Sequence, residues 1–338
     1  MAESTSPDGP PTAAPIPGAR PDPRAGAIPG QEFVYGAVQR LWSAAGKHRF
    51  RRDFDDVSAF CLFVGYPRSG HSLVGAMLNA HPDAVIAHEL DVLELVERGA
   101  PRSDLYGRLL ARAAWFNLRG NQSNYRYQIP GQWQGRFRAL RVIGDKGGGW
   151  AAQRLKEAPG LLERLRECVG VPLRLIHVVR NPFDNVAAIS LWHGMPLAEA
   201  TDFFFSHCES TARLEKQLSD DEIMTVRHED FFVEPEAALA RLVEFLGLTP
   251  EPSYLAACAA IVFRRPTHTR TRVSWTEAEV ESVRTGMEPY GFFDGYGFET
   301  GDTSESTGQR PAAATGGAQV TGDGFVRRLA DFLAPKAG

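Results

Sequence analysis

Short apolar runs alternate with stretches of helical periodicity along the central part of the chain. The apolar runs at residues 60–64, 84–87, 141–143, 173–179 and 223–226 are bounded by turn residues, which is typical of buried strands in a parallel sheet. Apolar positions three and four residues apart predict helices at 72–80, 91–97, 104–118, 151–167, 184–192, 197–218 and 235–246. This alternation predicts an α/β fold, a three-layer domain with a central parallel β-sheet flanked by helices.

The two ends of the chain differ from this pattern. Residues 1–30 are rich in Pro, Gly and Ala, and they carry too little apolar surface to offset their ordering entropy, so we expect a disordered tail. Residues 299–324 have the same character and lead to an amphipathic stretch at 325–336. We predict a short helix there, which docks on its own domain or, alternatively, binds a partner. The folded domain is therefore expected to span residues 31–298.

Composition restricts the partners and the compartment. The chain has 37 Lys and Arg against 41 Asp and Glu, a net charge of -4, so neither nucleic acid nor a membrane surface is an expected partner. Its four cysteines are far apart, which favours reduced thiols. Because no export signal or long apolar segment is visible, we expect a cytoplasmic protein, and the Ala- and Arg-rich composition favours a bacterial source.

A glycine loop follows the first predicted strand. In "VGYPRSGHSL", Gly65, Gly70 and Ser72 stand where a G-x-x-x-x-G-K-[ST] phosphate loop has them, but His71 replaces the lysine. The N–H groups that open the next helix would bind anionic oxygens. The strand of "LRLIHVVRNP" ends in Arg180, where a triphosphatase would use a carboxylate to hold magnesium. The pattern therefore predicts a P-loop-like site for an anion that is bound without a metal.

These two segments resemble the sulfotransferase family that uses 3′-phosphoadenosine 5′-phosphosulfate (PAPS). "YPRSGHSL" is similar to the family's loop for the 5′-phosphosulfate, and "VVRNPFDNVAAIS" to its element for the 3′-phosphate. The resemblance extends to "RVIGDKGGG", "VRHEDFFVEPEAALARLVEFLGL" and "RTRVSWTEAEVESV", and is closest in motif style to the tyrosylprotein and carbohydrate branch. It implies a sulfotransferase whose cofactor is PAPS, whose product is PAP, and which requires no metal.

The resemblance also implies a set of cofactor-binding residues. They are Arg68, Ser69, Gly70, His71, Ser72, Leu73, Arg180, His228, Arg270 and Arg272. Arg68 can direct two hydrogen bonds at the phosphosulfate. At the 3′-phosphate, Ala188 stands where the family usually has a serine, and Ser190 is turned about 200° away on a helix. Arg270 and Arg272 are candidates to compensate, and His228 is either an adenine-stacking residue or a buried structural histidine.

The predicted catalytic group lies at strand ends. Glu89, which follows the strand at 84–87, matches the catalytic glutamate of the tyrosylprotein branch, and we predict that it is the general base. His88 is the alternative, because the small-molecule branch uses a histidine. Two neighbours at a strand end are expected to point in different directions, so that only one serves. Lys146 in "GDKGGG" is expected near the leaving oxygen, and Arg68 beside the sulfuryl group.

The segment at 99–140 is the predicted acceptor-binding insertion. It interleaves Trp115, Phe116, Tyr125, Tyr127 and Trp133 with arginines, a mixture that suits a hydroxyl acceptor on a small molecule, a sugar or a peptide. The predicted function is in-line transfer of the sulfuryl group of PAPS to that hydroxyl. Two alternatives remain. One is a P-loop kinase with a modified loop, which would need magnesium and ATP. The other is a PAP-binding protein without activity, which Ala188 motivates.

Overall fold

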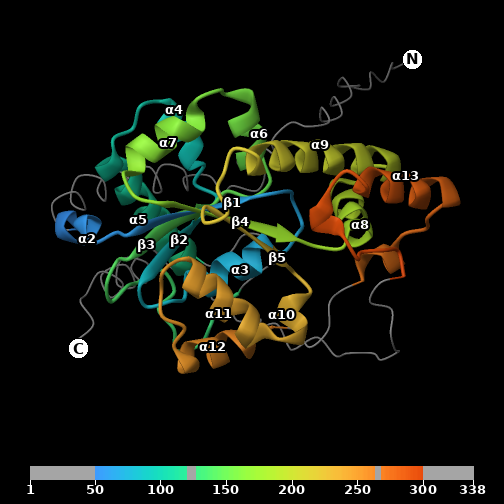
Figure 1. The fold of residues 1–338 in the computed structure, drawn as a ribbon. Helices are drawn as coiled ribbons and strands as arrows, with labels where there is room; N and C mark the ends of the chain where they lie inside the picture. Colours follow the sequence, from blue (N-terminus) through green and yellow to red (C-terminus); the bar gives the residue numbers. More distant parts are fainter. Residues whose placement is uncertain (1–49, 120–126, 263–267, 300–338) are drawn as a thin grey trace, which may run out of the picture.

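A five-stranded parallel sheet forms the centre of the chain (Figure 1). The structure is a computed structural model, and it describes residues 50–119, 127–262 and 268–299. The strands are β1 (Ala59–Val64), β2 (Ala84–His88), β3 (Val142–Lys146), β4 (Leu173–Val179) and β5 (Ile223–Arg227). They lie in the order β2-β3-β1-β4-β5, and every neighbouring pair is parallel. This confirms the predicted α/β class and all five predicted strands.

Helices follow the strands in the expected alternation. They are α2 (Arg51–Asp55), α3 (His71–Leu78), α4 (Val92–Glu97), α5 (Arg102–Arg119), α6 (Trp150–Glu157), α7 (Leu161–Val169), α8 (Pro182–His193), α9 (Leu197–Glu215), α10 (Asp230–Val233), α11 (Pro235–Phe245), α12 (Pro252–Ala259) and α13 (Glu277–Met287), with 3₁₀ turns η1 (Thr269–Arg272) and η2 (Gly291–Phe293). Each predicted helical segment contains a helix, whereas α2, α10, α12 and α13 were not predicted.

The prediction of one helix over 151–167 is wrong, because α6 and α7 are separate. The break falls at the sequence Ala158-Pro159-Gly160. Ala158 takes φ -116° and ψ 85°, since a residue before proline avoids the helical region. Gly160 then adopts a left-handed φ of 80° as the N-cap of α7. A helix with continuous apolar periodicity is thus divided by local backbone chemistry.

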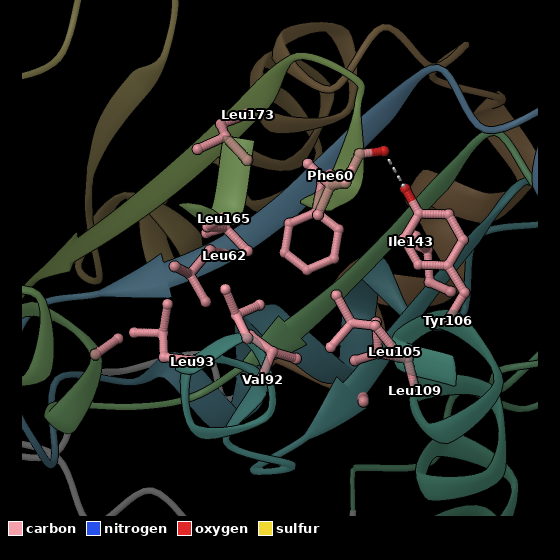
Figure 2. Close-up of a cluster of buried hydrophobic side chains, with 14 of the residues drawn as sticks. Phe60, Leu62, Val92, Leu93, Leu105, Tyr106, Leu109, Ile143, Leu165 and Leu173 are labelled. Carbon is pink, nitrogen blue, oxygen red and sulfur yellow. Dashed lines mark hydrogen bonds between the residues drawn. The ribbon is translucent and has the colours of Figure 1, made fainter. Parts of the chain in front are cut away.

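Apolar side chains fill both faces of the sheet. Alternate residues of β1 point to opposite sides: Phe60 and Leu62 belong to the cluster under α4, α5 and α7, while Cys61 and Phe63 belong to the cluster under α3, α11 and α12. Figure 2 shows the first cluster, in which the ring of Phe60 stacks on that of Tyr106, with centroids 6.3 Å apart. The buried strands therefore form the middle layer of three, as the apolar runs predicted.

The strand order creates a crevice at the carboxyl end of the sheet. From the central β1, the chain passes to β2 and β3 on one side and to β4 and β5 on the other. A reversal of this kind leaves a space beyond the strand ends, where α/β proteins bind their ligands. Beyond the end of β4, a third cluster joins α8, α9 and α13 around Phe183 and Phe204.

Some predictions fall on parts of the chain outside the described residues. These are the tail at 1–30, all but the first residue of the 299–324 linker, the helix at 325–336, and residues 120–126 of the insertion. Within the described ranges, no helix has the length and apolar character needed to cross a membrane.

Candidate active site

The loop between β1 and α3 has the backbone of an anion cradle. Gly65 and Gly70 take φ values of 125° and 104°, and Arg68 adopts a left-handed φ of 68°. Gly70 is the N-cap of α3, so the N–H groups of His71 and Ser72, which open that helix, have no acceptor in a preceding turn. The buried Ser69 donates a hydrogen bond from its hydroxyl to the Tyr66 carbonyl at 3.1 Å. This loop lies at the carboxyl end of the central strand, where the crevice opens.

Arg180 brings the second predicted anion element against this loop. It follows β4 directly, is 9% exposed, and donates from Nη1 to the Arg68 carbonyl at 3.1 Å. Its Nη2 donates to the Thr269 hydroxyl at 2.8 Å. The Asn185 side chain on α8 donates to the Pro67 carbonyl at 2.7 Å. The two segments, distant in sequence, therefore pack directly against each other at the carboxyl end of the sheet.

The third strand end supplies Lys146. The register of β2 and β3 places Lys146 opposite His88, and Glu89 follows at the edge. The Lys146 ammonium lies 2.5 Å from Glu89 Oε1 and 3.5 Å from the Ser72 hydroxyl, and Lys146 is only 3% exposed. The structure thus brings the predicted base and the predicted donor into direct contact beside the start of α3.

The charge state of Glu89 follows from this contact. Desolvation acts to raise its pKa, but the Lys146 ammonium, together with His88 and the hydrogen bond from Lys146, lowers the pKa to about 2. The Glu89 side chain keeps 56% of its surface exposed, so the ammonium contact sets the direction of the shift more than burial does. Glu89 is therefore an anion at neutral pH, held by a cation that an arriving ligand would also attract.

His88 lies beside Glu89 and does not point away from it. Its Nε2 is 3.8 Å from Glu89 Oε1, so the expectation of different directions is wrong. The reason is the left-handed φ of 54° at Glu89, which breaks the strand alternation. The His88 ring stacks on Phe116, with centroids 4.1 Å apart and planes 22° apart. Burial, and then Lys146, lowers the pKa of His88 to about 3, so the ring is neutral.

A pocket opens next to these groups. Its empty volume, counting the part open to solvent, is about 410 Å³. Ser72, His88 and Lys146 are among the residues that line it. Its other lining includes four residues of the predicted acceptor segment, which are Phe116, Asn117, Tyr127 and Gln134. The described lining carries no arginine, although arginines are frequent in that segment; Arg138, for example, is paired with Asp83 and Glu251.

His71 is a buried part of the loop. It is 5% exposed, its ring meets Phe63 edge to face, and its Nε2 has no hydrogen-bond partner among the described residues. Burial, and then Lys146 and His177, lowers the pKa of His71 to about 3. A neutral ring directed into the protein does not take over the task of a phosphate-loop lysine. Lys146, arriving from β3, supplies the cation at this position instead.

His228 packs against the loop glycine. A β-carbon at Gly70 would collide with the His228 ring, so this contact and the φ of 104° together require glycine. Burial, and then Arg180 and His71, lowers the pKa of His228 to about 3. The ring also meets Phe232 edge to face at 4.9 Å. His228 therefore supports the loop, and adenine stacking stays a prediction.

The other predicted 3′-phosphate residues differ in placement. Arg270 is 2% exposed and donates from Nη1 to Asp184 Oδ2 at 2.7 Å, while its backbone N–H donates to Oδ1 at 2.9 Å. This ion pair joins η1 to α8 and favours a structural role for Arg270. Arg272 is exposed. Ala188 is 6% exposed, and the Ser190 hydroxyl donates to the Met195 carbonyl at 2.7 Å, so Ser190 is not available to replace the family's serine.

Sequence reasoning missed several residues that contact this site. Asn185 and Thr269 hold the loop and Arg180, as described above, and the Arg68 guanidinium lies over the Trp192 ring, 4.6 Å from its centroid. Their only sequence signal is their proximity to motif residues. No group of three or more His, Cys, Asp or Glu side chains suited to a metal is present in the described residues.

Comparisons with known proteins give a likeness of fold. No protein-family model and no curated protein sequence matches this chain. The sulfotransferase domain from the Synechococcus PCC 7002 olefin synthase is 17% identical, with a TM-score of 0.46 over 70% of this chain and 95% of that domain. Sulfotransferase STF9 from Mycobacterium avium is 11% identical, with a TM-score of 0.43 over 77% of this chain and 84% of its own.

A mouse sulfotransferase, SULT7A1, solved in complex with PAP, is 15% identical, with a TM-score of 0.36 over 66% of this chain and 68% of its own. The chain is thus similar in structure to sulfotransferase domains at low sequence identity. This likeness does not distinguish a branch of the family.

Proposed function

We propose that this protein is a metal-independent sulfotransferase, which moves the sulfuryl group of PAPS to a hydroxyl of an acceptor. The observation that carries the proposal is the contact between Arg180 and the Arg68 carbonyl, which joins two anion-binding elements into one site of suitable charge. PAPS carries anionic groups at both ends of its ribose, and it supplies an activated sulfuryl group when bound.

The residues of the crevice fit such a ligand. The helix N-terminus at Gly70, the guanidinium groups of Arg68 and Arg180, and the Lys146 ammonium all favour negative charge. The Glu89 carboxylate touches this set through its contact with Lys146. The His228 ring packs against Gly70, and its Nδ1 is buried without a hydrogen-bond partner among the described residues. Cations at two positions thus match a ligand with two separated anionic groups.

Each residue then has a defined task. Arg68 and the loop N–H groups hold the phosphosulfate, and Arg180 holds the 3′-phosphate. Lys146 donates hydrogen bonds toward the oxygen on which negative charge accumulates as the sulfuryl group departs. When Lys146 turns to that oxygen, Glu89 loses its ammonium partner, its pKa rises toward the ordinary value, and it accepts the proton of the acceptor hydroxyl. The pocket beside Phe116 and His88 orients that hydroxyl.

The kinase alternative is disfavoured by the same residues. His71 is neutral and buried where a kinase loop has its lysine, and Arg180 would repel magnesium. The alternative of a PAP-binding protein without activity rests only on Ala188, which stands where the family usually has a serine.

Calorimetric titration tests the proposal. We expect PAP to bind with or without a chelator, and to bind more tightly than magnesium ATP. Arg180→Ala should weaken PAP binding by about tenfold to a hundredfold, the scale of hydrogen bonds to a charged group. Arg213→Ala, which removes an exposed arginine paired with Glu209, is the matched control and should leave the affinity unchanged. A preference for magnesium ATP would refute the proposal. The inactive alternative would be supported if the protein binds PAP but transfers no sulfuryl group from PAPS to any acceptor in a panel of phenols, sugars and tyrosyl peptides.

A further inference from the structure

The turn that carries Glu89 has an uncommon backbone. Glu89 and Asp91 take left-handed φ values of 54° and 63°, although neither is glycine. Non-glycine residues adopt this region rarely, and two such residues in one short turn persist only where the surroundings impose the conformation. The orientation of the Glu89 carboxylate toward Lys146 depends on this turn, because the same conformation breaks the strand alternation.

Asp145 on β3 supplies that constraint. It is fully buried, and its two carboxylate oxygens accept hydrogen bonds from two N–H groups of the turn, Leu90 N at 3.0 Å and Val92 N at 3.2 Å. The next residue, Lys146, accepts a hydrogen bond on its carbonyl from Glu89 N at 3.2 Å. The end of β3 therefore accepts hydrogen bonds from three of the four N–H groups between Glu89 and Val92.

The other side of the turn is also held. Arg112 on α5 donates from Nε to the His88 carbonyl at 2.7 Å. Asp91 caps α4 through Glu94 N and pairs with Arg154 at 3.1 Å. Asp145 is the residue whose side chain bonds the turn directly on both sides of Asp91. A carboxylate suits this task because both of its oxygens accept, whereas a carboxamide offers one acceptor and would set an N–H group against the second donor.

We propose that Asp145 is a positioning residue for transfer, which holds the Glu89 turn in the geometry that places the carboxylate beside Lys146 and the acceptor pocket. This inference rests on the proposed function, in which Glu89 is the general base. Adjacent residues of a strand point to opposite faces, so β3 directs Lys146 into the site and Asp145 into the support of the turn behind it. Two adjacent residues of the sequence "GDK" thus have linked tasks: Lys146 is the hydrogen-bond donor of the site, and Asp145 supports the turn that carries Glu89.

Kinetics of Asp145→Asn test the inference. The variant should lower kcat by about 10- to 100-fold, the scale of a small misplacement of a catalytic group, while the PAP dissociation constant stays within about twofold. In a Glu89→Gln background the same substitution should cause no further loss, because Asp145 acts through Glu89. Asp104→Asn, which alters a carboxylate paired with Arg108 on α5, is the matched control and should keep the full rate.

Amide hydrogen exchange of the wild-type protein provides a readout that needs neither activity nor a folded variant. Leu90 and Val92 N–H groups should exchange at least about 100-fold more slowly than unprotected amides. The inference would be overturned by fast exchange of the Leu90 and Val92 N–H groups. It would also be overturned by a full transfer rate in Asp145→Asn, or by an additive loss of rate in the double variant with Glu89→Gln. None of these outcomes would affect the proposed function. Failure of the wild-type protein to bind PAP would instead refute the proposed function, and with it the catalytic role of the turn.

Discussion

The guanidinium of Arg68 lies over the indole of Trp192, 4.6 Å from the ring centroid, although Trp192 is 54% exposed. Arg68 belongs to the glycine loop between β1 and α3, and Trp192 is the last residue but one of α8, the helix that begins just after Arg180. The helix therefore contacts the loop near both of its ends. The exposed indole thus holds the guanidinium of Arg68 against the last turn of α8.

Removal of the indole should slow transfer. A cation–π contact of this kind contributes about 0.5–2 kcal/mol, so Trp192→Ala should lower kcat/KM for PAPS by about 2- to 30-fold. Trp192→Phe should recover most of the rate, since it keeps an aromatic face. Leu191→Ala removes the exposed neighbour and should have no effect. An equal loss in the alanine and phenylalanine variants would contradict this role of the ring.

Substitution of Glu89 separates the two candidate bases. Glu89→Gln should keep the PAP affinity and lose about 10²- to 10⁴-fold in the transfer rate, because proton acceptance is lost while the shape is kept. His88→Asn should have a smaller effect, because burial is the main cause that lowers the pKa of His88 to about 3 and would persist when Lys146 turns away, whereas the low pKa of Glu89 comes from Lys146. Single-turnover rates with bound PAPS measure both. A full rate in Glu89→Gln with a large loss in His88→Asn would transfer the role to His88.

Ala188→Ser should strengthen PAP binding. It restores the hydroxyl that the family has at this position, and a hydrogen bond to a charged phosphate contributes about 1.5–3 kcal/mol, which corresponds to about tenfold to a hundredfold in affinity. Ser190→Ala should leave the affinity unchanged, because the Ser190 hydroxyl is bonded to the Met195 carbonyl. Calorimetry measures both variants. An unchanged affinity in Ala188→Ser would place the 3′-phosphate away from this face of α8.

Acid should destabilise the fold below about pH 6.5. The pKa values of His71, His88 and His228 are each lowered to about 3, chiefly by burial, so below pH 6.5 the unfolded chain binds protons that the folded protein does not. Each such histidine lowers the free energy of unfolding by up to about 1.4 kcal/mol per pH unit. Asp145, whose pKa is raised to about 6 by burial, acts in the opposite direction between about pH 6 and 4.

The net expectation is a fall in stability between pH 6.5 and 4, since three groups oppose one. Denaturant unfolding at a series of pH values measures it, and His71→Gln should reduce the slope by about one proton. Stability that is constant or rises as the pH falls through this window would show that these rings are not buried and neutral in the folded protein.

The sequence by itself determined the five strands and the position of the glycine loop that follows the first of them. The apolar runs specified β1 to β4 because a strand buried on both faces needs continuous apolar residues, and a shorter run specified the half-buried edge strand β5. The turn residues around Gly65 and Gly70 marked the loop. It did not reveal the break at Pro159, because the apolar periodicity continues through residues that local backbone chemistry excludes from a helix.

Only the tertiary structure decided which side chains meet. Lys146 and Glu89 lie 2.5 Å apart because β2 and β3 are neighbours in the sheet, an order that no local pattern encodes. His71 and Arg270 are residue types suited to binding anions, yet both are buried. His71 lies in the interior beneath the loop, and Arg270 forms an ion pair with Asp184. Strand and loop formation depend on nearby residues along the chain, whereas these contacts depend on the packing of segments that are far apart in the sequence.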